Sequence, residues 1–147
     1  MTRASHVFLL IGGCKAATDE ATISTHLGVE ASRFGAVTSN VLQPDNTYAP
    51  VVHGYSWRLD SPQIEGDLGS RLSALADLIE PFAHQLSTLD SRFHPLIRAF
   101  YQSPWQGAEI IEFTLEPTLM SRFAGWNLRI KYEHILVGES DAKARTS

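Results

Sequence analysis

Apolar residues recur at helical spacing over one long stretch of the chain. Leucine, isoleucine and phenylalanine follow one another at intervals of four and three residues from Leu68 to Leu89. This spacing places one apolar stripe along a helix of about six turns, which we expect to pack against a sheet. A coiled-coil seam shows the same spacing, but three heptads are few for one. Pro81 has no amide hydrogen, so the helix is expected to kink or restart there.

Two segments show the patterns of strands in the first half of the chain. Val7 to Ile11 is an uninterrupted apolar run that ends at Gly12-Gly13, which is typical of a central strand buried on both faces. Residues 55–60 alternate apolar and polar side chains, which is the period of a half-buried strand. Between these segments, residues 29–52 are predicted to be irregular, with a short strand around residues 36–41.

Three further strands are expected in the second half. Pro95 opens a strand that runs through Tyr101, and residues 110–115 are predicted to form its hairpin partner. Residues 128–134 alternate apolar and polar side chains, and this last strand is expected to pair antiparallel with a neighbour.

Two short helices complete the pattern. Asp19 or Thr18 is expected to cap the first, in which Ile23 and Leu27 share one face, and Gly28 stands where a helix commonly ends. The second is predicted from Pro117 to residue 124, because proline is favoured in the first turn of a helix.

This order of elements predicts the α+β class. We expect a mostly antiparallel sheet with one long and two short helices packed on one face, as a variant of the ferredoxin-like arrangement. Residues 1–137 are predicted to form a single domain, and residues 138–147 a polar, flexible tail.

Composition and charge narrow the class of protein. Hydrophobic residues make up 44% of the 147 residues and charged residues 19%, as in ordinary globular domains. The formal net charge is −4 and no dense basic cluster occurs, so nucleic acid is not an expected partner.

Cys14 is the only cysteine and is expected to be a small buried side chain at a strand end. Without a signal-peptide core or a membrane-spanning run, we expect a soluble cytoplasmic protein that has no membrane partner.

No catalytic, nucleotide-binding or metal-binding motif occurs in the chain. The six histidines form no metal-ligand spacing, and the glycine pair at 12–13 lacks the rest of a phosphate-binding motif. Glu112 and Glu116 alternate with apolar neighbours, as on the wet face of a strand. We therefore expect no cofactor and consider an enzyme the less favoured class.

Polar loops with aromatic and acidic residues are the expected partner-binding positions. Trp105, between a proline and a glycine, is not readily explained by packing, and exposed aromatic residues are common at the centres of interfaces. The candidate contact residues are Asp45, Tyr48, Asp60, Glu65, Asp67, Trp105 and Glu109.

Several short stretches together resemble a bacterial family known as domain of unknown function 4279. They are His26-Leu27-Gly28-Val29-Glu30-Ala31, Ser56-Trp57-Arg58-Leu59, Leu75-Ala76-Asp77-Leu78-Ile79-Glu80-Pro81 and Phe113-Thr114-Leu115-Glu116-Pro117. The similarity covers roughly residues 6 to 136. It implies a compact bacterial cytoplasmic domain of the kind also found among small immunity proteins, and it transfers no functional residue.

Three hypotheses for function follow. The first is a non-enzymatic protein-binding module of the toxin-immunity type, because acidic residues attract a basic partner. The second is a small-molecule-binding domain, with a pocket between the long helix, the sheet and residues 36–52. The third is an enzyme that uses dispersed residues such as His53, Glu112 and His134.

Overall fold

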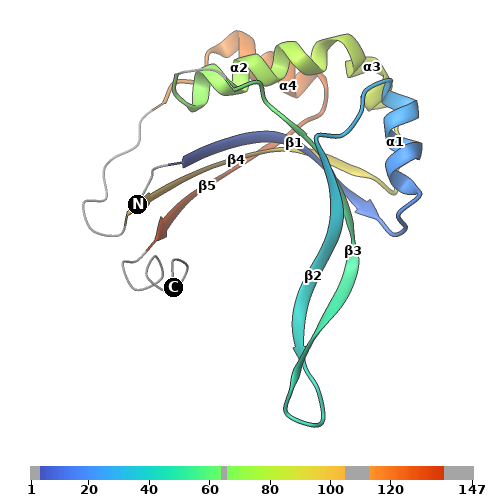
Figure 1. Cartoon of the computed structure of the whole chain (residues 1–147). Helices are drawn as coiled ribbons and strands as arrows, with labels where there is room; N and C mark the ends of the chain where they lie inside the picture. Colours follow the sequence, from blue (N-terminus) through green and yellow to red (C-terminus); the bar gives the residue numbers. More distant parts are fainter. Residues whose placement is uncertain (1–3, 64–65, 105–112, 138–147) are drawn as a thin grey trace.

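The computed structural model describes residues 4–63, 66–104 and 113–137 (Figure 1). The tail predicted at 138–147 therefore lies outside the described residues. In chain order the elements are β1 (Ala4–Cys14), α1 (Asp19–Leu27), β2 (Arg33–Leu42), β3 (Tyr48–Asp60), α2 (Leu68–Ile79), the 3-10 turn η1 (Glu80–Phe82), α3 (Ala83–Ser87), β4 (His94–Pro104), α4 (Pro117–Gly125) and β5 (Ile130–Val137).

The described strands form one sheet in the order β2-β3-β1-β4-β5. β1 lies in the middle and pairs antiparallel with both β3 and β4. Val7, Leu9 and Ile11 alternate along β1 and are buried, and Phe8, which faces the other side, is buried as well. The prediction of a central strand with two covered faces is therefore confirmed over its middle, although Leu10 is only half-buried.

The last strand is predicted to be antiparallel, and this prediction is wrong. β5 runs parallel to β4, in a register from Ile97 opposite Ile130 to Ser103 opposite Leu136. α4 lies between the two strands in the chain, and a helical crossover of this kind brings the chain back in the same direction. The sheet is thus antiparallel except at this edge.

The hairpin partner predicted for β4 at residues 110–115 is not found in the described part of that segment. Residues 110–112 lie outside the described residues, and residues 113–116 form no strand. Both edges of β4 are already occupied, one by β1 and the other by β5. No edge remains at which a hairpin strand could pair with β4.

The apolar stripe forms the centre of the helical layer, as predicted. Its members Leu68, Leu72, Leu75, Ile79, Phe82 and Leu86 are all buried, whereas the last predicted member, Leu89, lies beyond the end of α3 at Ser87 and is half-buried. The helix also restarts at Pro81, since α2 ends at Ile79 and a 3-10 turn carries the chain into α3. Helix α1 is confirmed too: Ile23 and Leu27 are buried, and Gly28 ends the helix with φ 74°.

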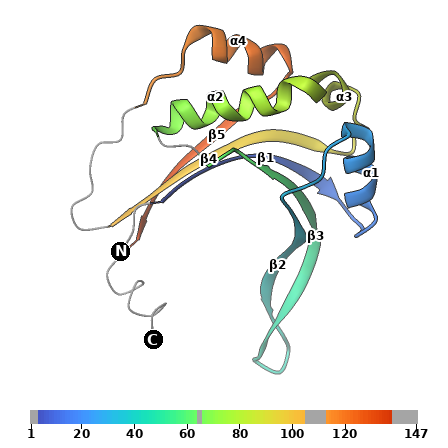
Figure 2. The same ribbon diagram turned by 45° about the horizontal axis from the view of Figure 1, so that its top comes forward.

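Helices α2 and α4 lie over the same face of the curved sheet, with α1 and α3 at one end of it (Figure 2). The core lies between this layer and the sheet, and Trp57 of β3 is fully buried in it. The indole Nε1 of Trp57 donates a hydrogen bond to Ser24 Oγ of α1 at 3.0 Å. The expected α+β class with helices on one face is therefore confirmed.

Residues 29–52 are predicted to be irregular apart from a short strand around residues 36–41; the strand is confirmed, but the irregular remainder is wrong. β2 covers Arg33–Leu42, and the chain turns over residues 43–47 directly into β3. The pairs run from Arg33 opposite Arg58 to Leu42 opposite Tyr48. Most side chains at the far end of this hairpin are exposed whichever face they occupy, so the sequence lacks the alternation that marks a half-buried strand.

Candidate functional site

The far part of the β2–β3 hairpin is a projecting arm, which we define as residues 37–54. β1 pairs with β3 only between Tyr55 and Asp60, so the arm is two-stranded and extends away from the helices (Figures 1 and 2). Gly54 marks its base. With φ 146°, this glycine passes so close to β1 that an added Cβ would lie 2.7 Å from the carbonyl oxygen of Cys14. Only glycine fits this approach.

The arm exposes apolar side chains on both of its faces. Tyr48 is 69% exposed, Val52 54% and Leu42 53%. Of the nine large hydrophobic side chains exposed in the described residues, six belong to the arm; the other arm members are Val37, Val41 and Val51. Asp45 is the arm's only Asp, Glu, Lys or Arg. An exposed, nearly uncharged apolar surface of this kind is typical of a binding surface.

The turn at the tip of the arm is held by Asp45. Its carboxylate accepts hydrogen bonds from the Thr47 hydroxyl at 2.6 Å and from the Thr47 amide at 3.1 Å. These hydrogen bonds lower the pKa of Asp45 below its ordinary value, and the bond from the Thr47 hydroxyl has the largest effect. Asn46 follows with φ 68°, a conformation that asparagine tolerates better than most residues. Asp45 therefore shapes the turn that presents Tyr48.

A second feature is a polar hollow of about 200 Å³ beside the N-terminal end of β1, which we call the arginine hollow. β3 stops pairing with β1 at Asp60, opposite Phe8, and the hollow lies beyond that point. Arg58 contacts the Asp60 carboxylate through Nε, and its guanidinium carbon lies 3.9 Å from the centre of the Phe8 ring. The residues that carry its chemistry are His6, Arg33, Arg58, Asp60 and Arg71.

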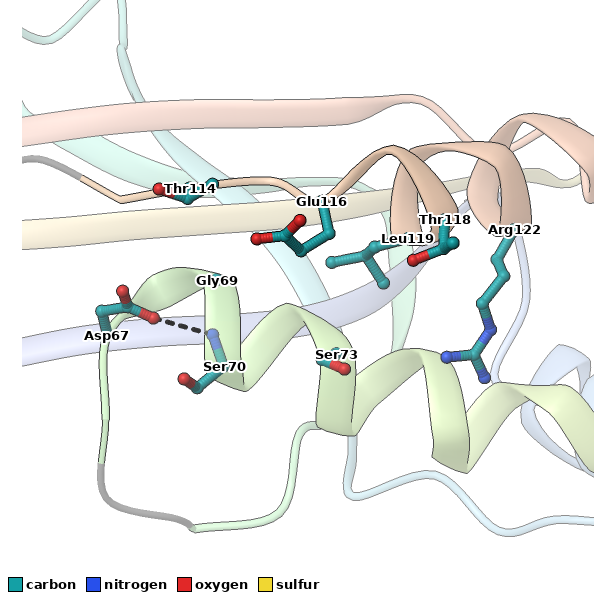
Figure 3. A pocket seen from close by; sticks show the side chains of 9 residues that line it. All are labelled: Asp67, Gly69, Ser70, Ser73, Thr114, Glu116, Thr118, Leu119 and Arg122. Atoms are coloured by element: carbon teal, nitrogen blue, oxygen red, sulfur yellow. Dashed lines mark hydrogen bonds between the residues drawn. The ribbon is translucent and has the colours of Figure 1, made fainter.

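A third feature is a groove of about 330 Å³ between the first turns of α2 and α4 (Figure 3). Asp67 lies at one end and caps α2 by accepting a hydrogen bond from the Ser70 amide at 2.8 Å. Arg122 lies at the other end and pairs with Asp77 at 3.0 Å and Glu80 at 3.4 Å. The groove is lined mainly by hydroxyl and carboxylate groups, which include those of Ser73, Thr118 and Glu116.

The candidate contact residues are distributed over these three features. Asp45 and Tyr48 lie together at the tip of the arm, Asp60 lines the arginine hollow and Asp67 lines the groove. Of these four described residues, the structure brings only Asp45 and Tyr48 together. Glu65, Trp105 and Glu109 lie outside the described residues.

Two of the dispersed residues considered for an enzyme, His53 and His134, do not meet. His53 lies on the arm, where its ring contacts the Ser39 hydroxyl. His134 lies on β5, where it is 2.8 Å from the hydroxyl of the buried Ser103 and packs edge-on against Tyr101. β1 and β4 separate β3 from β5 in the sheet, and Glu112 lies outside the described residues. Within the described ranges, no group of three potential metal ligands converges.

Cys14 is a buried side chain at the end of β1, as expected. Burial is the main cause that raises the pKa of its thiol, and the nearby Asp19 carboxylate adds to the effect. The thiolate is the nucleophilic form of cysteine, so this environment opposes reactivity.

The arginine hollow and the groove between α2 and α4 were not foreseen from the sequence. Arg33, Arg58 and Arg71 are far apart in the chain and form no cluster. They meet only because β2 and β3 pair and because α2 returns over β1. The arm did carry a signal, namely eighteen residues with a single charge, but its scattered Asn and Pro residues suggested a loop instead.

Comparison with protein-family models, with curated proteins and with solved structures found no match for this chain. Among the described residues, no helix is both long enough and apolar enough to cross a membrane.

Proposed function

We propose that this chain is a non-enzymatic protein-binding module that inserts its arm into an apolar cleft of a partner protein. The observation that carries the proposal is the concentration of exposed apolar side chains on the arm, with Asp45 as the only charge. Apolar side chains that no part of the described chain covers are stabilised when a partner removes them from water.

The shape of the arm supports the same proposal. A two-stranded ribbon is narrow and presents two faces, and its tip carries Tyr48 beside a turn fixed by Asp45. Tyrosine is enriched at the centres of interfaces because it combines a large apolar ring with one polar group. A partner cleft that receives this tip would bury Tyr48 together with Leu42 and Val52.

The finer form of the proposal is that the partner is a toxin and the chain its immunity protein. The net charge of −4 supports this form, because it favours association with a basic protein over long distances. We also propose membership of the family known as domain of unknown function 4279, on the four stretches quoted above, and a cytoplasmic location.

We further propose that β1 to β4 with α1 and α2 are a variant of the ferredoxin-like arrangement. In support, α1 connects β1 to β2 while β3 lies between these two strands, as in a split βαβ unit. α4 and β5 would then be an addition at the β4 edge.

The test is binding of the products of neighbouring genes by the wild type and by two matched triple variants. The first changes Leu42, Tyr48 and Val52 to serine. The control changes Met120, Tyr132 and Leu136 to serine, which are the exposed large hydrophobic side chains outside the arm in the described residues. We expect the arm variant to lose at least about a hundredfold in affinity, since a central aromatic residue alone contributes about 2 kcal/mol or more.

Two outcomes contradict the proposal. In one, a neighbouring gene product binds the arm variant as tightly as it binds the wild type. In the other, light scattering shows that the chain alone is a dimer and that only the arm variant is monomeric, because the arm would then be occupied by a second copy.

The second hypothesis, a small-molecule site between the long helix, the sheet and residues 36–52, has less support. Residues 36–52 belong to the extended hairpin, and none of them lines any of the hollows described above.

A further inference from the structure

The arginine hollow concentrates positive charge in a chain whose formal net charge is −4. Three arginines line it, and Asp60 is its only carboxylate among the described lining residues. Among the described lining residues, three positive charges and one negative charge leave a local excess of two positive charges. The three guanidinium groups come from β2, β3 and α2, so the fold brings them together from separate elements.

The contacts within the hollow leave donors without acceptors. Arg58 is engaged by Asp60 and by the Phe8 ring. Arg71 uses Nη1 to donate to the carbonyl oxygen of Ser5 at 2.8 Å, but its Nε is buried and has no hydrogen-bond partner in the described part of the chain. Arg33 makes no ion pair with any described residue. A buried donor without an acceptor is costly, and an anion in the hollow would remove that cost.

His6 adds a neutral polar group to the same wall. Its ring stacks on Phe100 with centroids 4.7 Å apart. The pKa of His6 is lowered, mainly by burial and further by the positive charges of Arg58 and Arg71. The negative charge of Asp60 acts in the opposite direction. This shift favours the neutral imidazole, whose N–H can donate a hydrogen bond. The hydroxyls of Ser5 and Ser61 lie in the same lining.

We propose that the arginine hollow binds a phosphate group, held mainly by Arg33 and Arg71. A phosphate monoester carries nearly two negative charges at neutral pH, which matches the local excess of two positive charges. Its oxygens accept the forked hydrogen bonds that guanidinium groups donate. The hollow is small and polar. The site therefore selects the phosphate group itself and not an apolar group to which the phosphate is attached. This site is separate from the arm and does not depend on the partner proposed above.

The experiment is an NMR titration of the full chain with inorganic phosphate, with sodium chloride at matched ionic strength as the control. We expect saturable shifts at residues around the hollow. We also expect the pKa of His6 to rise when phosphate is present, because a nearby anion favours the imidazolium form. The other histidines are the internal reference. Glycerol phosphate in a parallel titration tells whether the free ion or a phosphate ester is the preferred source.

Variants make the assignment specific. Arg33→Met removes an exposed side chain without an ion pair, so the fold is not at risk, and we expect phosphate binding to weaken about tenfold or more. Arg71→Lys keeps the charge but loses the fork, and it should weaken binding as well. The matched control is Arg129→Met, which changes an exposed arginine between α4 and β5. This variant should bind phosphate as tightly as the wild type does.

The proposal is overturned if phosphate produces no saturable shift beyond that of chloride. It is also overturned if Arg33→Met and Arg129→Met weaken binding equally, because the attraction would then come from general charge and not from the hollow.

Discussion

The guanidinium group of Arg92 lies 3.0 Å from the buried carboxylate of Asp19, to which it donates a hydrogen bond. Asp19 also accepts hydrogen bonds from the amides of Lys15 at 2.9 Å and Ala16 at 3.2 Å. Asp19 begins α1, and Arg92 lies just before β4. One carboxylate therefore closes the turn between β1 and α1 and ties it to the start of β4.

This arrangement predicts a contribution of Asp19 to stability that is lost in acid. The pKa of Asp19 is lowered, first by the Lys15 amide and then with help from Ala16 and Arg92. The folded state thus binds this proton more weakly than the unfolded chain does. The stabilisation is fully present above the ordinary pKa of 3.8 and decreases as the pH falls below it.

We expect Asp19→Asn to lower the free energy of unfolding at pH 7, with a difference from the wild type that shrinks below pH 3.8. Urea denaturation followed by circular dichroism measures it. Glu20→Gln, next in the chain and exposed, is the control and should show no such convergence. A difference for Asp19→Asn that stays constant down to low pH would contradict the prediction.

The Trp57 indole is predicted to be a main source of core stability. It is fully buried and donates to Ser24 Oγ at 3.0 Å. We expect Trp57→Ala to cost about 3–5 kcal/mol in the free energy of unfolding. Trp126→Ala removes a half-buried indole and should cost clearly less. A double-mutant cycle of Trp57→Phe with Ser24→Ala should give a coupling of about 1 kcal/mol, and additive losses would show that the hydrogen bond contributes nothing.

Gly69 is predicted to set the distance between α2 and the chain before α4. An added Cβ at this position would lie 2.4 Å from the carbonyl oxygen of Thr114. We expect Gly69→Ala to destabilise the fold by about 1–3 kcal/mol, although alanine is the better helix former. Gly125→Ala in α4 meets nothing within 4 Å and should be neutral or stabilising by up to about 1 kcal/mol. Equal effects of the two substitutions would argue against the close contact.

The arm is predicted to open locally without unfolding of the rest. Beyond Tyr55 its strands pair only with each other, and a two-stranded ribbon is marginally stable in water. We expect the amides of residues 38–52 to exchange with deuterium much faster than those of Val7 to Ile11 in the central strand, because arm amides open in local fluctuations. Exchange of both segments at the same rate would mean that the arm and the body unfold together.

The local pattern predicted those elements that bury one face. The stripe from Leu68 to Leu86 is buried in the structure, and so is the run from Val7 to Ile11 except for the half-buried Leu10. The helix is interrupted at Pro81 and α1 ends at Gly28, as expected. These elements were predictable because burial on one face imposes a regular spacing on the sequence. The far part of the β2–β3 hairpin carries no such spacing, because most of its side chains meet solvent, so the sequence predicts only a short strand around residues 36–41 within an irregular segment.

The candidate sites were less accessible to prediction. Tyr48 and Asp45 were expected to contact a partner and do lie together at an exposed tip. Asp60, by contrast, was assigned a partner but pairs with Arg58 inside the arginine hollow, and Asp67 is occupied as the cap of α2. Side-chain type alone does not tell whether a carboxylate is free or already paired, because the local backbone decides this: Arg58 lies on the same strand as Asp60, and the Ser70 amide lies in the helix that Asp67 caps.

The sequence by itself determined the α+β class, the helical layer and the central strand, because each follows from residues close together in the chain. Only the tertiary structure decided that β5 runs parallel to β4, that residues 37–54 form an arm, and that Arg33, Arg58 and Arg71 line one hollow. The physical reason is that strand pairing and helix packing join segments distant in the chain. The backbone groups that pair two strands are the same for every residue except proline, so the pairing partner cannot be read from residue types within one segment.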